Sequence, residues 1–478
     1  MNNTAPVSPL DLSSRQKLRG IGAIIGSAVG DALGAPFEFG PAGQYTETFP
    51  QPVLGGVGEM IGGGSFNWEE GEFTDDTQLA VALAEALLGA GCEFDAETTW
   101  AHFKSWSKNA NDIGMTTQAS LAGSNFREAS RLAHESKGFS RGNGSVMRVA
   151  PVGVAGVCWG QKETCSVAYE QSALTHFDPI ACWSSVVAAE IIRQLILGEQ
   201  FEDAVGAALG CIDDSNRQTF THRLDSGWSP DPELSENNGI ADVCLAQAVW
   251  AIRTTSSFEQ AVIAAIDLGD DTDTVAAVTG ALAGALYGVD QIPARWVTYV
   301  HGVVTQPSGE MRHYFQHDLA ALAYDLMQTE SRPMTPPEQV FKPLEVHDIG
   351  VSACNLLGAE LAKAEVGIVS LCRMEGRLHN FKYRREFFLI DEQGDDSNPN
   401  LEAIVQDAVA TIEAFLSEGR EVLVHCHGGR SRTGLILKAW YMRRYQVDHF
   451  EAETWIESKW PLYSTWNIDF YEFLNSEW

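Results

Sequence analysis

The chain has 478 residues, of which 45% are hydrophobic and 20% charged, an ordinary composition for a globular protein with more than one domain. Its formal net charge of −32 argues against nonspecific binding to nucleic acid or to an anionic membrane, because both need basic patches. The nine cysteines form no CxxC pair, which predicts reduced thiols rather than a disulfide framework or a zinc site.

The N-terminal segment MNNTAPVSPLDLSSRQ lacks a charged region followed by an apolar core, so the sequence predicts no signal peptide. The apolar runs further along look too short, or too interrupted by glycine, to cross a bilayer. We therefore expect a cytoplasmic protein with no membrane partner.

The first helical segment, residues 18–38, reads LRGIGAIIGSAVGDALGAPFE. Its alanines and glycines recur at helical spacing, which predicts a tightly packed, buried helix. Gly34 and Pro36 end this helix and place Glu38 on a loop, where a solvated carboxylate and a functional one are both plausible. The glycine-rich segment that follows, VLGGVGEMIGGGSFNWEEGEF, indicates a loop that closes over a ligand.

Two clusters of Asp and Thr each precede a helix: FTDDT at 73–77 and LGDDTDT at 268–274. Asp and Thr are favoured at helix N-caps, so an unusually polar cap is the alternative interpretation. A cap uses one or two such side chains, whereas these clusters hold more. Oxygen ligands suit Mg²⁺ and Mn²⁺. The two clusters together therefore predict a shared metal site.

Residues 78–324 read as helix after helix, with Gly, Asn or Pro between them and almost no alternating strand pattern, which predicts an all-α domain. Within it, the loop SRGNGSVMR at 140–148 has glycines whose amides suit a phosphate at a helix start, although such a loop alone is weak evidence. His176, in LTHFDP, lies just ahead of a helix, where a capping or packing role is more common than ligand binding.

Five motifs occur in one order along the chain: GDALGAPFE, FTDDTQLA, SRGNGSVMRVAP, SALTH and LGDDTDTVAAVTGALAGALYG. In that order they resemble the ADP-ribosylglycohydrolase family over roughly residues 15–330. The resemblance implies an all-α domain that holds two Mg²⁺ or Mn²⁺ ions between its acidic clusters. The implied metal ligands are Thr74, Asp75, Asp76, Asp271, Asp273 and Thr274.

The same resemblance implies that Glu38 is a mobile glutamate near the bond to be cleaved. The residues implied to lie along the bound ADP-ribose are Ser140, Gly142, Asn143 and Gly144 at the diphosphate, with His176 nearby. The residues after Glu38 and the segment DSGWSPDPELSENN look individual to this chain, so we expect them to shape specificity.

The chemistry of these residue types is consistent with hydrolysis of a glycosidic bond. Two cations can grip vicinal hydroxyls of the distal ribose and orient a water. The glycosidic bond at C1″ then breaks through an oxocarbenium-like state, and Glu38 protonates the leaving group or activates water. Hydrolysis by two carboxylates without metal is the alternative, which the consecutive Thr-Asp-Asp and Asp-Thr-Asp-Thr clusters disfavour.

The proline-rich segment SRPMTPPEQVFKP, residues 331–343, is predicted to be a linker between domains 15–330 and 344–478. Beyond it, the strand-like runs EVGIVSLC, REFFLID and EVLVHC alternate with helical segments such as LEAIVQDAVATIEAFLSEG. This alternation predicts an α/β domain with a parallel central sheet.

Residues 422–434 read VLVHCHGGRSRTG: a strand ends at Cys426, a glycine-bearing loop follows, and Arg432 stands at the start of a helix. Loop amides and a helix N-terminus favour an anion, and they also favour the thiolate form of the cysteine, which is the nucleophile. Arg432 can bind phosphate oxygens through two hydrogen bonds. A buried cysteine beside a glycine turn is the alternative.

The pattern HC-x5-R followed by Thr-Gly resembles the signature of cysteine-dependent tyrosine and dual-specificity phosphatases, over about residues 340–465. It implies that Cys426 forms a phosphocysteine, that Arg432 holds the phosphate and that Thr433 assists the leaving group. A general-acid aspartate is expected about thirty residues upstream. The candidates are Asp395 and Asp396, with Asp391 at the end of the preceding strand as a further one.

We therefore expect a two-domain enzyme, in which a metal-dependent hydrolase is fused to a phosphatase. The hydrolase is expected to remove ADP-ribose from a modified target, with protein arginine as the first choice. The expected partners are an ADP-ribosylated protein or an ADP-ribose-containing small molecule, and a phosphorylated substrate. In one alternative the first domain only binds ADP-ribose and delivers the phosphatase to its substrate. In another the second domain is a docking module for a phosphorylated ligand.

Overall fold

The computed structural model describes residues 11–231, 237–329, 337–373, 376–394, 397–476 and 478. They form two compact units. Unit 1 contains the chain up to Pro50, Met60–Ile292 and the chain from Val300 to the linker, and unit 2 contains Gln51–Glu59, Pro293–Tyr299 and the chain after the linker. Part of the predicted linker lies outside the described residues, and the domain limits 15–330 and 344–478 stay predictions.

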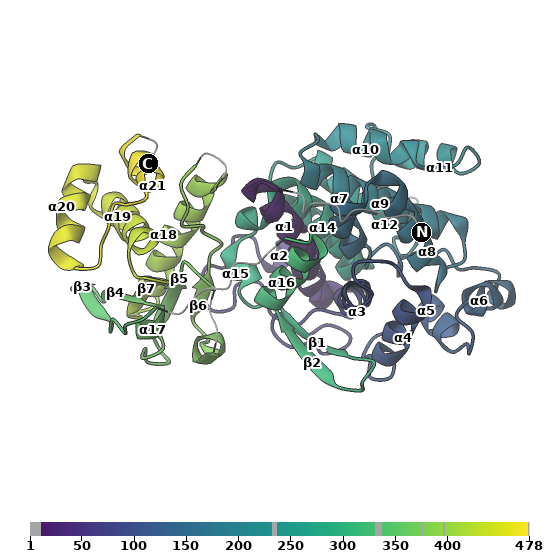
Figure 1. Cartoon of the computed structure of the whole chain (residues 1–478), viewed down its shortest axis with the longest axis horizontal. Helices are drawn as coiled ribbons and strands as arrows, with labels where there is room; N and C mark the ends of the chain where they lie inside the picture. Colours follow the sequence, from purple (N-terminus) through teal and green to yellow (C-terminus); the bar gives the residue numbers. More distant parts are fainter. Residues whose placement is uncertain (1–10, 232–236, 330–336, 374–375, 395–396, 477) are drawn as a thin grey trace, which may run out of the picture. The chain divides into compact units, whose positions relative to one another are not determined.

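Unit 1 is a helical assembly with one β-hairpin (Figure 1). Its helices are α1 (Ser14–Gly34), α2 (Gln44–Thr48), α3 (Asp75–Gly89), α4 (Ala96–Trp106), α5 (Met115–Leu121), α6 (Ala129–Lys137), α7 (Ala150–Trp159), α8 (Gln161–Ala173), α9 (Pro179–Leu197), α10 (Phe201–Gly210), α11 (Arg217–Arg223), α12 (Ala241–Arg253), α13 (Phe258–Ile266), α14 (Thr272–Tyr287) and α16 (Gln316–Leu326). The hairpin pairs β1 (His301–Thr305) with β2 (Met311–Phe315) antiparallel. The predicted helical fold is confirmed, and the hairpin is an addition that the sequence did not predict.

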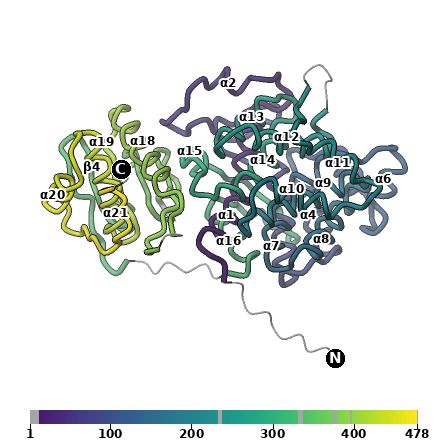
Figure 2. Tube along the Cα trace, turned by 90° about the horizontal axis from the view of Figure 1, so that it is seen from above, coloured from purple at the N-terminus to yellow at the C-terminus, as the bar shows by residue number. Residues whose placement is uncertain are grey.

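Helices α1 and α14 lie side by side at the centre of unit 1 (Figure 1 and Figure 2). Glycines allow this close approach: a Cβ on Gly26 would lie 2.3 Å from the carbonyl oxygen of Gly280, and a Cβ on Gly30 would lie 2.0 Å from that of Ala276. The contact brings the C-terminal end of α1 beside the N-terminal end of α14. Asp31 and Asp273 therefore meet although 242 positions separate them (273 − 31).

The expectation that the apolar runs are too short, or too interrupted by glycine, to cross a bilayer is wrong for two helices by length and composition. The helical stretch Ser14–Phe37 and α9 are both long and apolar enough to do so. However, 94% and 78% of their most apolar windows are buried inside the structure, as in the core helices of a soluble domain. Their apolar side chains are accounted for by packing within unit 1.

Unit 2 is built on a five-stranded sheet with the strand order β3-β4-β7-β5-β6. Its elements are α15 (Ala294–Val297), β3 (Leu344–His347), β4 (Val351–Asn355), α17 (Leu356–Ala359), β5 (Gly367–Ser370), β6 (Arg384–Glu386), α18 (Leu401–Ser417), β7 (Val422–Cys426), α19 (Ser431–Tyr445), α20 (His449–Lys459) and α21 (Ile468–Ser476). The α/β prediction is confirmed. The sheet is mixed rather than wholly parallel, because β3 joins β4 antiparallel at one edge.

The predicted strand REFFLID is shorter than expected, since β6 ends at Glu386. The amide of Phe387 still donates to the Ser370 carbonyl at 2.9 Å, but the amide of Leu389 turns back to the carbonyl of Phe387. The chain therefore leaves the sheet edge at this point. This departure carries Asp391 towards the loop after β7.

Arg385 joins the separate segments of unit 2. Its guanidinium is fully buried and donates to the carbonyl oxygens of Leu54 and Gly56 and to the hydroxyl of Tyr299, at 2.9–3.0 Å. A buried cation needs such acceptors, because an unpartnered charge in the interior is costly. The segments Gln51–Glu59 and Pro293–Tyr299 are thus structural parts of unit 2.

Candidate active sites

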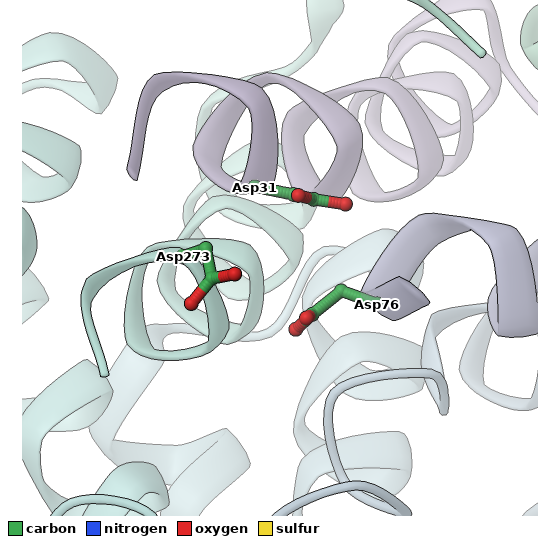
Figure 3. A group of neighbouring side chains, drawn as sticks. All are labelled: Asp31, Asp76 and Asp273. Carbon is green, nitrogen blue, oxygen red and sulfur yellow. The ribbon is translucent and has the colours of Figure 1, made fainter. Parts of the chain in front are cut away.

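Three buried aspartates converge in unit 1: Asp31 from α1, Asp76 from the first turn of α3 and Asp273 from the first turn of α14 (Figure 3). One carboxylate oxygen of each lies within 4.8 Å of the others. A second group of the same kind contains Glu38, Asp271 and again Asp273. The two oxygen-rich groups share one carboxylate and so form a single acidic site, with the type of donor atom that hard cations take.

Asp31 is held by the segment that carries the first acidic cluster. Its Oδ1 accepts the Thr74 amide at 2.9 Å, and its Oδ2 accepts the Thr77 amide at 3.0 Å and the Thr77 hydroxyl at 2.6 Å. Burial nevertheless raises the pKa of Asp31 to about 6, because desolvation outweighs these hydrogen bonds. Asp31 therefore both anchors α3 to α1 and contributes an oxygen to the cluster.

Asp76 is the most crowded carboxylate. The hydroxyls of Thr74 and Thr274 both donate to its Oδ2 at 3.3 Å, while its Oδ1 is buried with no hydrogen-bond partner among the described residues. Burial, followed by repulsion from Asp31 and Asp75, raises the pKa of Asp76 well above its usual range. A divalent cation would offset that repulsion, and the unpartnered Oδ1 could bind it. The residues present therefore fit the implied metal site.

Asp75 and Asp273 share this environment. Desolvation is the largest cause of the raised pKa of each, and charge repulsion from neighbouring carboxylates adds to it. The predicted acidic and hydroxyl residues of both clusters thus lie together. They stand at the N-termini of α3 and α14, which both lie beside the end of α1. Helix N-termini favour negative charge, which partly compensates for this concentration of carboxylates.

Glu38 follows the short turn Ala35–Phe37 at the end of α1. Its Oε2 is buried without a hydrogen-bond partner among the described residues. Burial raises the pKa of Glu38 to about 8, and repulsion from Asp112 and Asp271 contributes. Asp112 lies in the loop between α4 and α5, and burial raises its own pKa to about 6. Two carboxyl groups with different proton affinities therefore lie at the acidic cluster.

The loop at 140–144 lies against His176. The Ser140 hydroxyl accepts the Asp178 amide at 3.0 Å and pairs with His134 Nδ1 at 2.8 Å, so its hydrogen bonds are made within the protein. His176 is 1% exposed, and burial, with repulsion from Arg148, lowers its pKa to about 3. A neutral His176 thus supports the loop from beneath.

In unit 2, Cys426 ends β7, in the middle of the sheet, and is 1% exposed. The loop after it turns through Gly429 (φ +70°), where a Cβ would lie 2.7 Å from the Cys354 carbonyl oxygen, so the turn requires glycine. Helix α19 then starts at Ser431. Strand, cysteine, loop and helix N-terminus therefore stand in the predicted arrangement for an anion site.

Arg432 is oriented by backbone acceptors: its Nη1 donates to the carbonyl oxygens of Leu371 at 2.8 Å and Leu389 at 3.0 Å. Its Nε lies 3.5 Å from the carboxylate of Asp391, which also accepts the Ser431 hydroxyl at 2.7 and 2.8 Å. Asp391 therefore reaches the cysteine loop. The other two candidates for the general acid, Asp395 and Asp396, lie outside the described residues.

The hydroxyl of Thr433 is fully buried and has no hydrogen-bond partner in the part of the chain that the structure describes. A buried hydroxyl without a partner is costly, so its retention needs a reason. Thr433 lies in the first turn of α19, and the role that the phosphatase signature implies for it stays a prediction.

The sequence model of the ADP-ribosylglycohydrolase family matches residues 12–334, more than half of the chain. The chain belongs to the ADP-ribosylglycohydrolase family. The model of the dual specificity phosphatase catalytic domain matches residues 352–474. The chain therefore combines a part that belongs to this family with a C-terminal part that is similar to a dual specificity phosphatase catalytic domain.

Characterised relatives resemble the glycohydrolase part. The ADP-ribosylarginine hydrolase Tri1 of Serratia proteamaculans is 31% identical over 303 residues, which cover 62% of this chain and 78% of that protein. The ADP-ribosyl-[dinitrogen reductase] glycohydrolase of Rhodospirillum rubrum is 29% identical over 281 residues, 59% of this chain and 89% of its own. A solved chain titled ADP-ribosylglycohydrolase-related protein complex superposes with a TM-score of 0.51 at 30% identity, covering 66% of this chain and 98% of the other.

Two acidic residues of the glycohydrolase site were missed in the sequence. Asp31 had a usable signal, since it is a charge within an otherwise apolar Ala/Gly helix and such a residue is rarely buried without a partner. Asp112 had none, because it lies in the polar loop SKNANDIGM, where an aspartate is unremarkable. Only the packing of that loop against the acidic cluster singles it out.

Proposed function

We propose that the glycohydrolase part removes ADP-ribose from modified arginine on a protein and that it depends on two Mg²⁺ or Mn²⁺ ions. The observation that carries this proposal is the pair of carboxylate groups, one buried and one half-buried, that share Asp273. The family membership and the names of the two relatives, which act on ADP-ribosylarginine and on ADP-ribosyl-dinitrogen reductase, support it. The residues that would hold the metal are Asp31, Thr74, Asp75, Asp76, Asp271, Asp273 and Thr274.

Bound divalent cations supply Lewis-acid polarisation and a grip on vicinal ribose hydroxyls. The chain's own residues supply the proton chemistry. Glu38, whose pKa is raised by burial and by repulsion from Asp112 and Asp271, is the carboxyl that we assign to donate a proton to the leaving nitrogen as the C1″–N bond breaks. Asp112, beside it, is the carboxyl that we assign to accept a proton from the attacking water.

The test is release of ADP-ribose from an arginine-ADP-ribosylated protein, with Mg²⁺ or Mn²⁺, with EDTA, and with the Asp271→Ala variant. We expect metal-dependent release that the variant loses. Release from a serine-linked substrate but not from the arginine-linked one would reject the arginine assignment and keep the hydrolase. Release unaffected by EDTA would reject the metal.

We further propose that unit 2 hydrolyses phosphate monoesters through Cys426. The thiolate attacks phosphorus, the ester oxygen leaves with a proton from Asp391, and water then releases phosphate from the phosphocysteine. Arg432, held by the carbonyls of Leu371 and Leu389, presents its remaining guanidinium donors to the phosphate. The Cys426→Ser variant should abolish turnover and still bind phosphate, whereas loss of binding as well would indicate a collapsed loop.

A further inference from the structure

The side chain of Asn143 has no free donor for a diphosphate. An asparagine amide carries two N–H groups. In Asn143 one donates to the carbonyl oxygen of Asn238 at 3.1 Å and the other to Oδ2 of Asp271 at 2.8 Å. Its backbone amide donates to the Gly239 carbonyl at 3.0 Å. Asn143 is only 8% exposed, and both N–H groups of its side chain are already used. It therefore cannot donate a side-chain hydrogen bond to phosphate oxygens.

Asn238 continues the same network from the other side. It is 3% exposed; its Oδ1 accepts the Asp271 amide at 3.1 Å and its Nδ2 donates to the Gly269 carbonyl at 3.0 Å. The turn between these two bonds is left-handed at Gly269, φ +77°, which glycine adopts freely, and at Asp270, φ +61°, where a residue with a side chain is strained. Such a turn needs support from outside, and Asn238 bridges its two ends.

We propose that Asn143 and Asn238 form an amide clamp that positions Asp271 as a metal ligand. This proposal rests on the metal site proposed above. Asn143 holds one oxygen of the Asp271 carboxylate and leaves the other for a cation, while Asn238 fixes the backbone from which that carboxylate projects. The clamp is neutral, so it orients the ligand without adding a positive charge that would repel the metal.

As residues that position Asp271, Asn143 and Asn238 should change the affinity for the metal ion. Truncating either amide should weaken metal binding about 10- to 100-fold, the usual effect of losing a group that orients a metal ligand. The effect should pass through Asp271 alone. A residue that contacted the diphosphate would instead change the affinity for ADP-ribose, with or without metal.

The experiment is titration of the full chain with Mn²⁺, followed by calorimetry, for the wild type, Asn143→Ala, Asn238→Ala, Asp271→Ala and Asn143→Ala combined with Asp271→Ala. We expect each asparagine variant to bind Mn²⁺ about 10- to 100-fold more weakly. The combined variant should match Asp271→Ala, because the clamp has nothing left to position. ADP-ribose affinity in EDTA should stay at the wild-type value.

The matched control is Asn398→Ala in unit 2, where an asparagine amide likewise bonds a backbone from both sides, donating to the Ile390 carbonyl and accepting its amide at 2.8 Å. Mn²⁺ affinity should not change there. If Asn143→Ala fails to fold, Asn143→Ser, too short to reach Asp271, takes its place.

Three results would overturn the clamp. In the first, the asparagine variants keep the wild-type affinity for Mn²⁺ but bind ADP-ribose more weakly in EDTA. Asn143 would then contact ADP-ribose instead of positioning Asp271. A further loss in the combined variant beyond that of Asp271→Ala would show that the amide acts elsewhere. No Mn²⁺ binding by the wild-type chain would reject the metal site itself and the clamp with it, an outcome distinct from failure of the variants alone.

Discussion

Glu38 lies on the turn after α1, beside Asp271 and Asp273, and one of its oxygens is buried without a hydrogen-bond partner among the described residues. A group that delivers a proton in the transition state typically contributes a factor of roughly 10²–10⁴. We expect Glu38→Gln to lower ADP-ribose release by that order and to keep ADP-ribose binding in calorimetry. The exposed Glu47 on α2 offers the matched control, Glu47→Gln, with unchanged release. Full release by Glu38→Gln would mean that another group delivers the proton, whereas ADP-ribose binding without release by the wild-type chain would favour the binding-module alternative.

Asp391 is the described aspartate that touches both Ser431 and Arg432. If it protonates the leaving oxygen, Asp391→Asn should slow hydrolysis of an alkyl phosphate by roughly 10²- to 10⁴-fold. The same variant should hardly affect a nitrophenyl phosphate, whose leaving group needs no proton. The measurement is kcat on both substrates, with Asp395→Asn and Asp396→Asn alongside. Equal loss on both substrates would mean that Asp391 only holds the loop.

At the scale of elements, the close contact of α1 and α14 decides whether the acidic cluster forms. A Cβ on Gly30 would lie 2.0 Å from the backbone of Ala276, and neither helix can yield without moving Asp31 or Asp273. We expect Gly30→Ala to lower the free energy of unfolding of unit 1 by about 1–3 kcal/mol and to weaken Mn²⁺ binding.

The matched control for this contact is Gly206→Ala in α10, where an added Cβ meets nothing within 4 Å. It should stabilise unit 1 by about 0.5–1 kcal/mol, because alanine restricts the unfolded chain and favours the helix. Urea unfolding of both variants measures the difference. Equal stabilities would contradict the interpretation that glycine is required between α1 and α14.

At the scale of the molecule, the acidic site should make the metal-free protein sensitive to pH. Asp31 and Asp112 have pKa values raised to about 6 and Glu38 to about 8, mainly by burial. A raised folded pKa contributes stability that is complete below the unfolded value, about pH 4, and is lost as pH rises through the folded value. In EDTA, the melting temperature of unit 1 should therefore fall between pH 5 and pH 9.

Calorimetry tests this, with the unit 1 transition identified by its upward shift in Mn²⁺. The shift should be larger at pH 9, where the ligands are deprotonated, than at pH 5. Glu38→Gln removes one of the groups and should flatten the fall between pH 7 and pH 9. A melting temperature that rises with pH in EDTA would contradict the assigned directions of the pKa shifts.

Unit 2 should depend on the segments Gln51–Glu59 and Pro293–Tyr299. Arg385→Met would leave the carbonyl of Leu54 without its buried donor, at a cost of about 1–3 kcal/mol, while the Gly56 carbonyl would keep the Tyr299 hydroxyl at 3.0 Å. We expect faster hydrogen exchange in residues 51–59 and 382–390. The exposed Arg443→Met is the control. Unchanged protection in Arg385→Met would show that other contacts hold these segments.

The sequence alone was sufficient for the two fold classes and the local chemistry. Runs of Asp and Thr ahead of a helix, and a cysteine between a strand and a glycine loop, act through neighbours in the chain, so a linear pattern records them. That is why the acidic clusters and the Cys426–Arg432 loop stand out by inspection. The family models confirm the two kinds of domain, and the roles of the individual residues stay predictions.

Tertiary structure decided which distant groups share a site. Asp31 and Asp112 join the cluster through helix packing and a folded loop, and Asn238 reaches Asp271 across 33 positions. The hairpin β1–β2 and the place of residues 51–59 in unit 2 likewise follow from long-range contacts. The physical reason is the same in each case. Folding buries these charges, strands and loops against residues far away in the sequence, and a local sequence pattern does not record such long-range contacts.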